Sequence, residues 1–243
     1  MNRNKGRTGI RKFIARMLPN HLIDVLLFEI HMAMVRVKSW NTSRNYRASS
    51  GLLLNIGAGG AGRSGWINVD GFMNQGVNCV FDVRKRLPFS DGSAKGIFLE
   101  HFFEHIDYLE EVPFFLSECN RVLQDNGVIR IIVPDAEKYL IAYARGGWQE
   151  LSTIRPLKAG HRDHYFHFKY NTRMELINVI FRQGQEHKFA YDYETLEYVL
   201  GAHGFSNITK QTYGVSIDPA LAIDNEDRAS ESLYVEAVKK ANS

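Results

Sequence analysis

Five glycines and one acid within residues 57–70 have the types and spacing of a ligand-binding loop. The glycines lie between two short apolar segments, and Asp70 ends the second of them. Glycine at the carboxyl end of a parallel strand lets backbone N–H groups approach a ligand without a Cβ in the way. An acid at the end of the next strand can accept hydrogen bonds from the hydroxyls of a ribose. The stretch is therefore a candidate nucleoside-binding site.

The same spacing does not fit a pyrophosphate-binding fingerprint. In that pattern a helix follows the glycines, and an acid comes about 20 residues after them. Here Asp70 comes sooner, and the residues between Gly60 and Trp66 leave no room for a crossover helix. A nucleoside ligand without phosphates fits this loop better.

Apolar runs and helical stripes alternate along the chain after Gly51, and they predict the elements that hold this loop. A helical stripe over 109–123 precedes the clearest buried strand, and a second helix is predicted between Asp192 and Gly204. This alternation predicts a mostly parallel sheet with helices on its faces. The predicted strands cover 52–56, 66–70, 77–83, 95–99, 127–133, 207–212 and 232–238.

Positive charge is concentrated at the start of the chain. The first 50 residues hold ten of the 30 lysine and arginine residues but two of the 27 acidic ones, so the remainder is mildly acidic. A body of that sign is not suited to a phosphate backbone, and nucleic acid is an unfavoured partner. We divide the chain into a basic extension with a helix over 20–38 and a linker (1–50) and a main domain (51–243). No membrane-spanning segment is predicted.

Three stretches follow one another over residues 52–140: LNIGAGG…GWINVD, FDVRKRLPFSDGSAKGIFLEHFFEHI and FLSECNRVLQDNGVIRIIVPD. In content and order they resemble the class I S-adenosylmethionine-dependent methyltransferases, most closely the small type 11 group. The resemblance implies an α/β enzyme with a doubly wound, mostly parallel seven-stranded sheet of the Rossmann-like methyltransferase fold. It also implies S-adenosylmethionine as the cofactor.

The resemblance assigns roles to residues of the loop and of the following strand ends. Asp70 matches the ribose-binding acid, and Asp82 matches an acid that accepts a hydrogen bond from the adenine amine. Asn55 stands where many members have an acid near the cofactor's amino group, so the charge pairing is lost there. The expected cofactor-binding residues are Asn55, Gly57, Ala58, Gly59, Asp70, Asp82, Val83 and Glu100.

Glu100 and His101 follow the predicted fourth strand, where cofactor and acceptor are expected to meet. The cofactor provides the leaving group, so the protein mainly aligns the reactants. An acceptor hydroxyl benefits from a base, and histidine titrates in the useful range. His101 is the first catalytic candidate and His105 the second, and packing or capping of the turn is the alternative for both.

A long insertion over 136–190 is expected to choose the acceptor. Within it, His161, His164 and His167 recur at intervals of three among aromatic residues. Such spacing is compatible with metal ligands on a helix, but chance matches are common. We expect an aromatic pocket wall here and no metal site.

Two absences argue against methylation of nucleic-acid bases. The Asn/Asp-Pro-Pro-Tyr/Phe run that accompanies amino-group methylation is replaced by Leu-Glu-His at residues 99–101, and neither Cys79 nor Cys119 is positioned as a nucleophile. We expect O-methylation of a small-molecule or saccharide-type acceptor. The saccharide preference comes from resemblance to proteins of cell-surface glycan synthesis. An RNA or other nucleic-acid methyltransferase and a non-catalytic cofactor-binding protein are the alternatives.

The remaining expectations concern location and assembly. We expect a cytoplasmic monomer or homodimer. The basic residues before Asp24 also leave open a peripheral contact with an anionic membrane surface.

Overall fold

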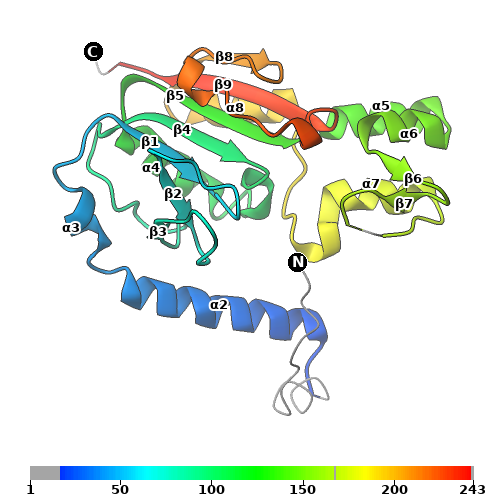
Figure 1. The fold of residues 1–243 in the computed structure, drawn as a ribbon, viewed down its shortest axis with the longest axis horizontal. Helices are drawn as coiled ribbons and strands as arrows, with labels where there is room; N and C mark the ends of the chain where they lie inside the picture. Colours follow the sequence, from blue (N-terminus) through cyan, green and yellow to red (C-terminus); the bar gives the residue numbers. More distant parts are fainter. Residues whose placement is uncertain (1–16, 167, 242–243) are drawn as a thin grey trace.

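A seven-stranded sheet forms the centre of the protein, as seen in a computed structural model that describes residues 17–166 and 168–241 (Figure 1). The strands are Leu52–Ile56 (β1), Ile67–Asp70 (β2), Cys79–Val80 (β3), Ala94–Glu100 (β4), Leu123–Pro134 (β5), Phe205–Gln211 (β8) and Ser232–Lys239 (β9). Their order is β3-β2-β1-β4-β5-β9-β8. β9 is antiparallel to both of its neighbours, whereas the other pairs are parallel. The predicted mostly parallel seven-stranded sheet is confirmed.

The register of β1 brings the predicted site to one edge of this sheet. Ile56, the last residue of β1, is paired with Val69 on β2 and with Leu99 on β4. Three neighbouring strands therefore end together. Gly57, Asp70 and Glu100 consequently leave the sheet at the same edge.

Two helices pack on one face of the sheet and share its main hydrophobic core: α4 (Val112–Val122) and α8 (Tyr193–Ala202). Pro113 lies in the first turn of α4, where a missing N–H costs no hydrogen bond. The Asp192 side chain caps α8 by accepting from the Thr195 N–H at 2.9 Å. Both helices and the Asp192 cap are as predicted. The opposite face is packed by Leu221, in the short helix η3 (Pro219–Leu221), which precedes η4 (Glu226–Arg228).

The segment after β5 forms a lobe at one end of the sheet, with a small hydrophobic core of its own (Figure 1). Buried Arg155 ties this lobe to the sheet, because it binds Asp163 within the lobe at 2.5 Å and Glu231 beside β9 at 2.6 Å. The lobe contains α5 (Ala136–Arg145), α6 (Trp148–Ile154), β6 (Leu157–Lys158), β7 (Arg162–Asp163), α7 (Arg173–Arg182) and η2 (Gln183–Gln185).

The N-terminal helix α2 (Asn20–Lys38) runs beside the β2–β3 end of the sheet (Figure 1). The prediction of a helix over 20–38 is confirmed. His31 Nε2 donates to the carbonyl of Gly71 at 2.9 Å, so α2 contacts the turn after β2. The expected linker 39–50 contains a short helix, α3 (Thr42–Tyr46). The basic residues before Met17 lie outside the described residues, and no helix among the described ones is long and apolar enough to cross a membrane.

The strand predicted over 77–83 is wrong at both ends, since only Cys79–Val80 is extended and paired. Turn hydrogen bonds compete with the ladder on each side. The Val77 N–H donates to the Asn74 carbonyl at 3.1 Å, and the Lys85 N–H donates to the Asp82 carbonyl at 3.0 Å. Asp82 therefore lies in a turn beyond the strand end, close to where the resemblance requires it.

Candidate functional site

The glycine loop is fixed to β2 by its own backbone. The N–H groups of Gly57 and Ala58 both donate to the carbonyl of Val69, at 2.9 and 3.1 Å. The buried amide of Asn55 donates to the carbonyl of Ala61 at 3.2 Å and to the side chain of Asn68 at 3.1 Å. Asn55 thus holds the loop in shape, a role that a carboxylate could not perform because it has no N–H to donate.

Gly57 has a φ of 75°, in the region that favours glycine, and Phe102 packs against it. A Cβ built on Gly57 would lie 2.4 Å from Cγ of Phe102, well inside any real contact distance. Gly59 and Gly60, by contrast, have open space on their Cβ side. The loop therefore uses its first glycine to admit an aromatic ring and leaves the next two accessible.

Asp70 is the acid at the centre of this edge. One carboxylate oxygen accepts from the N–H of Gly59 and the other from the N–H of Phe72, each at 2.8 Å. Each oxygen has a second lone pair, so the carboxylate can still accept from two hydroxyls. The position and free lone pairs of Asp70 fit a ribose diol.

Asp82 has a different environment, because two arginines hold its buried carboxylate. Arg84 binds both oxygens, through Nε at 2.9 Å and a terminal nitrogen at 3.1 Å, and Arg36 of α2 binds Oδ2 at 3.2 Å. Glu29, also of α2, binds Arg84 at 2.6 Å. We call Asp82, Arg84, Arg36 and Glu29 the guanidinium cluster. Bidentate arginine–carboxylate bonds are among the strongest in proteins, so an adenine amine would have to compete for this acceptor.

Electrostatics in the guanidinium cluster favour the charged forms. Burial disfavours the charge on Arg84, but its bonds to Asp82 and Glu29 outweigh this and raise its pKa above the usual value. The hydrogen bond from Arg84 lowers the pKa of Glu29. Sequence reasoning missed both arginines. Arg84 could have been inferred from its position two residues after Asp82 in a turn, whereas Arg36 has no local signal.

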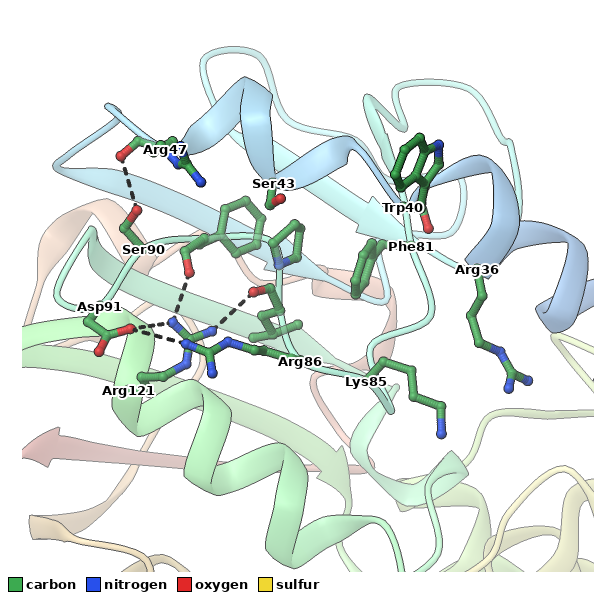
Figure 2. Close-up of a pocket in the computed structure, with 14 residues that line it drawn as sticks. Arg36, Trp40, Ser43, Arg47, Phe81, Lys85, Arg86, Ser90, Asp91 and Arg121 are labelled. Carbon is green, nitrogen blue, oxygen red and sulfur yellow. Dashed lines mark hydrogen bonds and ion pairs between the residues drawn. The ribbon is translucent and has the colours of Figure 1, made fainter.

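A cavity of about 510 Å³ lies beside this cluster, between α2, α3 and the segment after β3 (Figure 2). Its wall combines the rings of Trp40 and Phe81 with the cationic side chains of Lys85 and Arg86. No predicted site residue lines it. The cavity therefore belongs to the flank of β3 and not to the edge where the strands end.

Glu100 and His101 lie at the mouth of β4, as expected from the sequence. The Glu100 carboxylate accepts from the Asn225 N–H at 2.7 Å, and burial raises its pKa. His101 has a φ of 51°, which is uncommon for a residue other than glycine. The hydroxyl of Ser232 lies 3.0 Å from His101 Nε2. Strained residues of this kind often mark functional sites.

The two catalytic candidates meet at a third residue, Glu104, whose side chain is 2% exposed. Its Oε1 lies 3.5 Å from Nδ1 of His101 and 4.0 Å from Nε2 of His105. His187, from the segment after α7, approaches the same oxygen at 3.9 Å. We call Glu104, His101, His105 and His187 the imidazole cluster. The sequence indicated His101 and His105 but neither Glu104 nor His187.

The histidines of the aromatic stretch do not join this cluster in the described part of the chain. His161 stacks on Trp148 with ring centroids 3.7 Å apart, and His164 packs edge-on against Tyr165. His167 lies outside the described residues. Aromatic packing therefore accounts for the two members that can be placed.

Comparison with known proteins gives one family match and several similar structures. A family model for a methyltransferase domain matches residues 70–131. A S-adenosylmethionine-dependent methyltransferase from Thermotoga maritima is similar in structure, with 15% identity, 89% of this chain and 96% of that chain covered, and a TM-score of 0.48. One from Archaeoglobus fulgidus has 18% identity, coverage of 88% and 99%, and a TM-score of 0.45. No curated protein matches the sequence.

The match of residues 70–131 to a methyltransferase-domain model, together with the mostly parallel seven-stranded sheet, supports a class I S-adenosylmethionine-dependent methyltransferase. The same match supports S-adenosylmethionine as the methyl donor. Open space at Gly59 and Gly60 and the free lone pairs of Asp70 fit the cofactor's sugar. The adenine end fits less directly, because Asp82 is already bound by arginine.

Proposed function

We propose that the protein methylates an oxygen of a small-molecule or saccharide-type acceptor. The observation that carries this proposal is the position of His101 at the mouth of β4, beside Glu100 and at the edge where Asp70 also lies. The cofactor supplies an electrophilic methyl group on a sulfonium. Asp70 would hold the ribose of that cofactor, and His101 would take the proton of the acceptor hydroxyl as the oxygen attacks.

The lobe over 136–190 would select the acceptor, as its place next to this edge supports. Its segment 186–189 reaches the imidazole cluster, because the Lys188 N–H donates to the Glu104 carbonyl at 2.8 Å. Acceptors bound between lobe and sheet would therefore contact His101 or His105. In this proposal, residues 51–243 form the methyltransferase domain and residues 1–50 form an N-terminal extension.

His101→Asn tests the catalytic role, because asparagine tolerates a positive φ but cannot act as a base. The assay scores labelled methyl groups transferred from S-adenosylmethionine to separate pools of free saccharides, small phenols, RNA and protein. We expect transfer to the first two pools, and a fall in kcat of about 100-fold or more in the variant. Unchanged affinity for S-adenosylhomocysteine, measured by calorimetry, would exclude a general loss of structure. Transfer confined to RNA, or an unchanged kcat, would contradict the proposal.

We also propose that α2 rests on an anionic membrane surface. Leu22, Leu26, Ile30 and Val37 are exposed at spacings of four and seven, which places them on one side of the helix. The buried side of the helix carries Ile23, Met32 and Val35, and His31 contacts the turn after β2. The sequence before α2 is rich in lysine and arginine, which complements anionic lipid.

Sedimentation with vesicles tests this surface. We expect the protein to bind phosphatidylglycerol vesicles, to bind phosphatidylcholine vesicles much less, and to lose binding in Leu26→Glu. Glu194→Gln, a change on the distant helix α8, is the control and should bind as wild type does. A dimer in light scattering that Leu26→Glu dissociates, without vesicle binding, would assign the stripe to a second copy of the chain.

A further inference from the structure

Glu104 is a buried carboxylate, 2% exposed, whose two oxygens accept no hydrogen bond from the described residues. Burying a charged group without such partners is costly, and native structures rarely leave one in this state. Its Oε1 lies 3.5 Å from His101 Nδ1, 4.0 Å from His105 Nε2 and 3.9 Å from His187 Nε2. The buried carboxylate therefore needs a partner that the described residues do not supply as hydrogen-bond donors.

Hydrogen bonds to backbone carbonyls decide which nitrogens of the nearby histidines are free. His105 Nδ1 lies 3.1 Å from the carbonyl of Glu186, and His187 Nδ1 lies 2.7 Å from the carbonyl of Ile180. A carbonyl can only accept, so both Nδ1 atoms must carry the proton. In the neutral rings the Nε2 lone pairs then point toward Glu104.

His101 follows the same logic through Ser232. The hydroxyl of Ser232 donates to the carbonyl of Arg228 at 2.8 Å, and this uses its one hydrogen. His101 Nε2 must therefore donate to Ser232 Oγ, which leaves Nδ1 of the neutral ring facing Glu104 at 3.5 Å. Protonation of one ring would provide a partner for one lone pair only. A cation bound between the rings and the carboxylate would satisfy several at once.

The cluster is also held in place by the backbone, although its members are far apart in sequence. The N–H groups of Lys188 and Phe189 both lie within hydrogen-bonding distance of the Glu104 carbonyl, at 2.8 and 3.4 Å. The His187 N–H donates to the carbonyl of Arg182 at the end of α7. These backbone bonds hold the segment 187–189 against residue 104.

We propose that Glu104, His105 and His187 bind a divalent transition metal, with zinc the best match. Two imidazoles and one carboxylate are a typical zinc ligand set that leaves further positions open. The three ligand atoms lie within 4.8 Å of one another, and a zinc ion would draw them to roughly 3.4 Å. The His105 side chain is 29% exposed, whereas those of Glu104 and His187 are 2% exposed, so His105 is the ligand nearest to solvent.

This metal site is not at the place that histidine spacing in the sequence would indicate. The sequence predicts no metal, and its metal-like histidine spacing lies at 161–167, where the two described members stack on aromatic rings. With a metal bound, His105 is a ligand and is no longer a candidate base, whereas His101 is not among the three ligands. The inference rests on the cluster alone and does not depend on which acceptor is methylated.

The test is a titration of tag-free, chelator-treated protein with ZnCl₂ in a calorimeter, with CoCl₂ absorption spectra as a second readout. We expect one zinc per chain, visible cobalt bands typical of four or five ligands, and no heat with MgCl₂. His187→Ala and Glu104→Gln should each weaken zinc binding by about 100-fold or more. His105→Ala, which alters a partly exposed residue, gives the same test with less risk to folding.

His203→Ala is the matched control, because His203 Nδ1 also lies 2.7 Å from a backbone carbonyl, that of Val199, in a place where no metal-type cluster forms among the described residues. It should bind zinc as wild type does. Circular dichroism would confirm that each variant is folded. Absence of zinc binding by folded wild-type protein would overturn the site and indicate a protonated imidazole only. Equal zinc binding by wild type and His105→Ala would overturn it as well.

Discussion

Asp82 and Glu104 are both almost completely buried carboxylates near the ends of the parallel strands, yet the chain gives them different partners. The guanidinium cluster surrounds Asp82 with groups that are always charged. The imidazole cluster surrounds Glu104 with rings that are neutral or charged according to what they bind. Permanent charges suit a fixed structural contact, whereas rings with free lone pairs suit an exchangeable cation. The difference separates a carboxylate that is already paired from one that has no hydrogen-bond partner among the described residues.

The largest expected effect comes from Arg84→Met. This change removes two of the bonds to buried Asp82 and leaves its charge poorly compensated. We expect the free energy of unfolding at pH 7 to fall by about 3 kcal/mol, measured by urea denaturation. Arg86→Met is the control, because the Arg86 side chain is 74% exposed and comes no closer than 4.0 Å to Asp91. This change should lower the free energy of unfolding by less than about 0.5 kcal/mol. Equal losses in the two variants would show that the bonds to Asp82 are not structural.

Zinc should stabilise the wild-type protein through the imidazole cluster alone. At 100 times the dissociation constant, a ligand that binds only the folded state adds about 2.7 kcal/mol to the free energy of unfolding. We expect zinc to raise the thermal midpoint of the wild-type protein and of Arg84→Met, and to leave the midpoint of His187→Ala unchanged. A zinc-dependent shift that persists in His187→Ala would place the metal elsewhere.

Arg36→Ala should change cofactor affinity more than stability. Arg36 is partly exposed and occupies Oδ2 of Asp82, where an adenine amine would bind. We expect the affinity for S-adenosylhomocysteine to rise by about threefold to tenfold in calorimetry, because one competitor for Asp82 is removed. Lys38→Ala, an exposed change on the same helix, should leave the affinity unchanged. Unchanged affinity in Arg36→Ala would argue against Asp82 as an adenine contact.

The smallest effect is expected from Glu29→Gln. Arg84 lowers the pKa of Glu29 below its ordinary value of 4.5, so the folded state binds this proton less readily than the unfolded state. Its contribution to stability is therefore present above pH 4.5 and is lost as the pH falls through the lowered pKa. Thermal midpoints between pH 7 and pH 3.5 should fall slightly more steeply in wild type than in the variant. Parallel curves would show that this ion pair contributes nothing measurable.

Local pattern was sufficient to predict the strands of the main sheet and three of the helices, but not the elements of the lobe. The helix over 20–38 and the Asp192 cap follow from helical spacing and capping chemistry, and the strand after residue 127 follows from its β-branched residues. The strand over 77–83 was predicted too long because turn hydrogen bonds at Val77 and Lys85 are not visible in an apolar run. Contacts outside the strand itself therefore decide where β3 begins and ends.

The site was only partly predictable, for a related reason. Glycine spacing and strand order locate Asp70, because consecutive strand ends meet at one edge. His187 has no such signal, since it reaches Glu104 through the path of the lobe and not through any local spacing. Regular spacing pointed instead to His161 and His164, whose rings are engaged in aromatic packing. Histidine spacing alone does not identify a metal site without the topology that brings ligands together.

The contact of α2 with Asp82 has a practical consequence for experiments on shortened forms of the protein. A fragment that starts at Gly51 would retain every strand of the sheet but lose Arg36 and Glu29, which bind Asp82 and Arg84 from outside the sheet domain. Its donor affinity would then lack the competition between Arg36 and an adenine amine for Asp82. Ligand measurements on such a truncation cannot stand in for those on the whole chain.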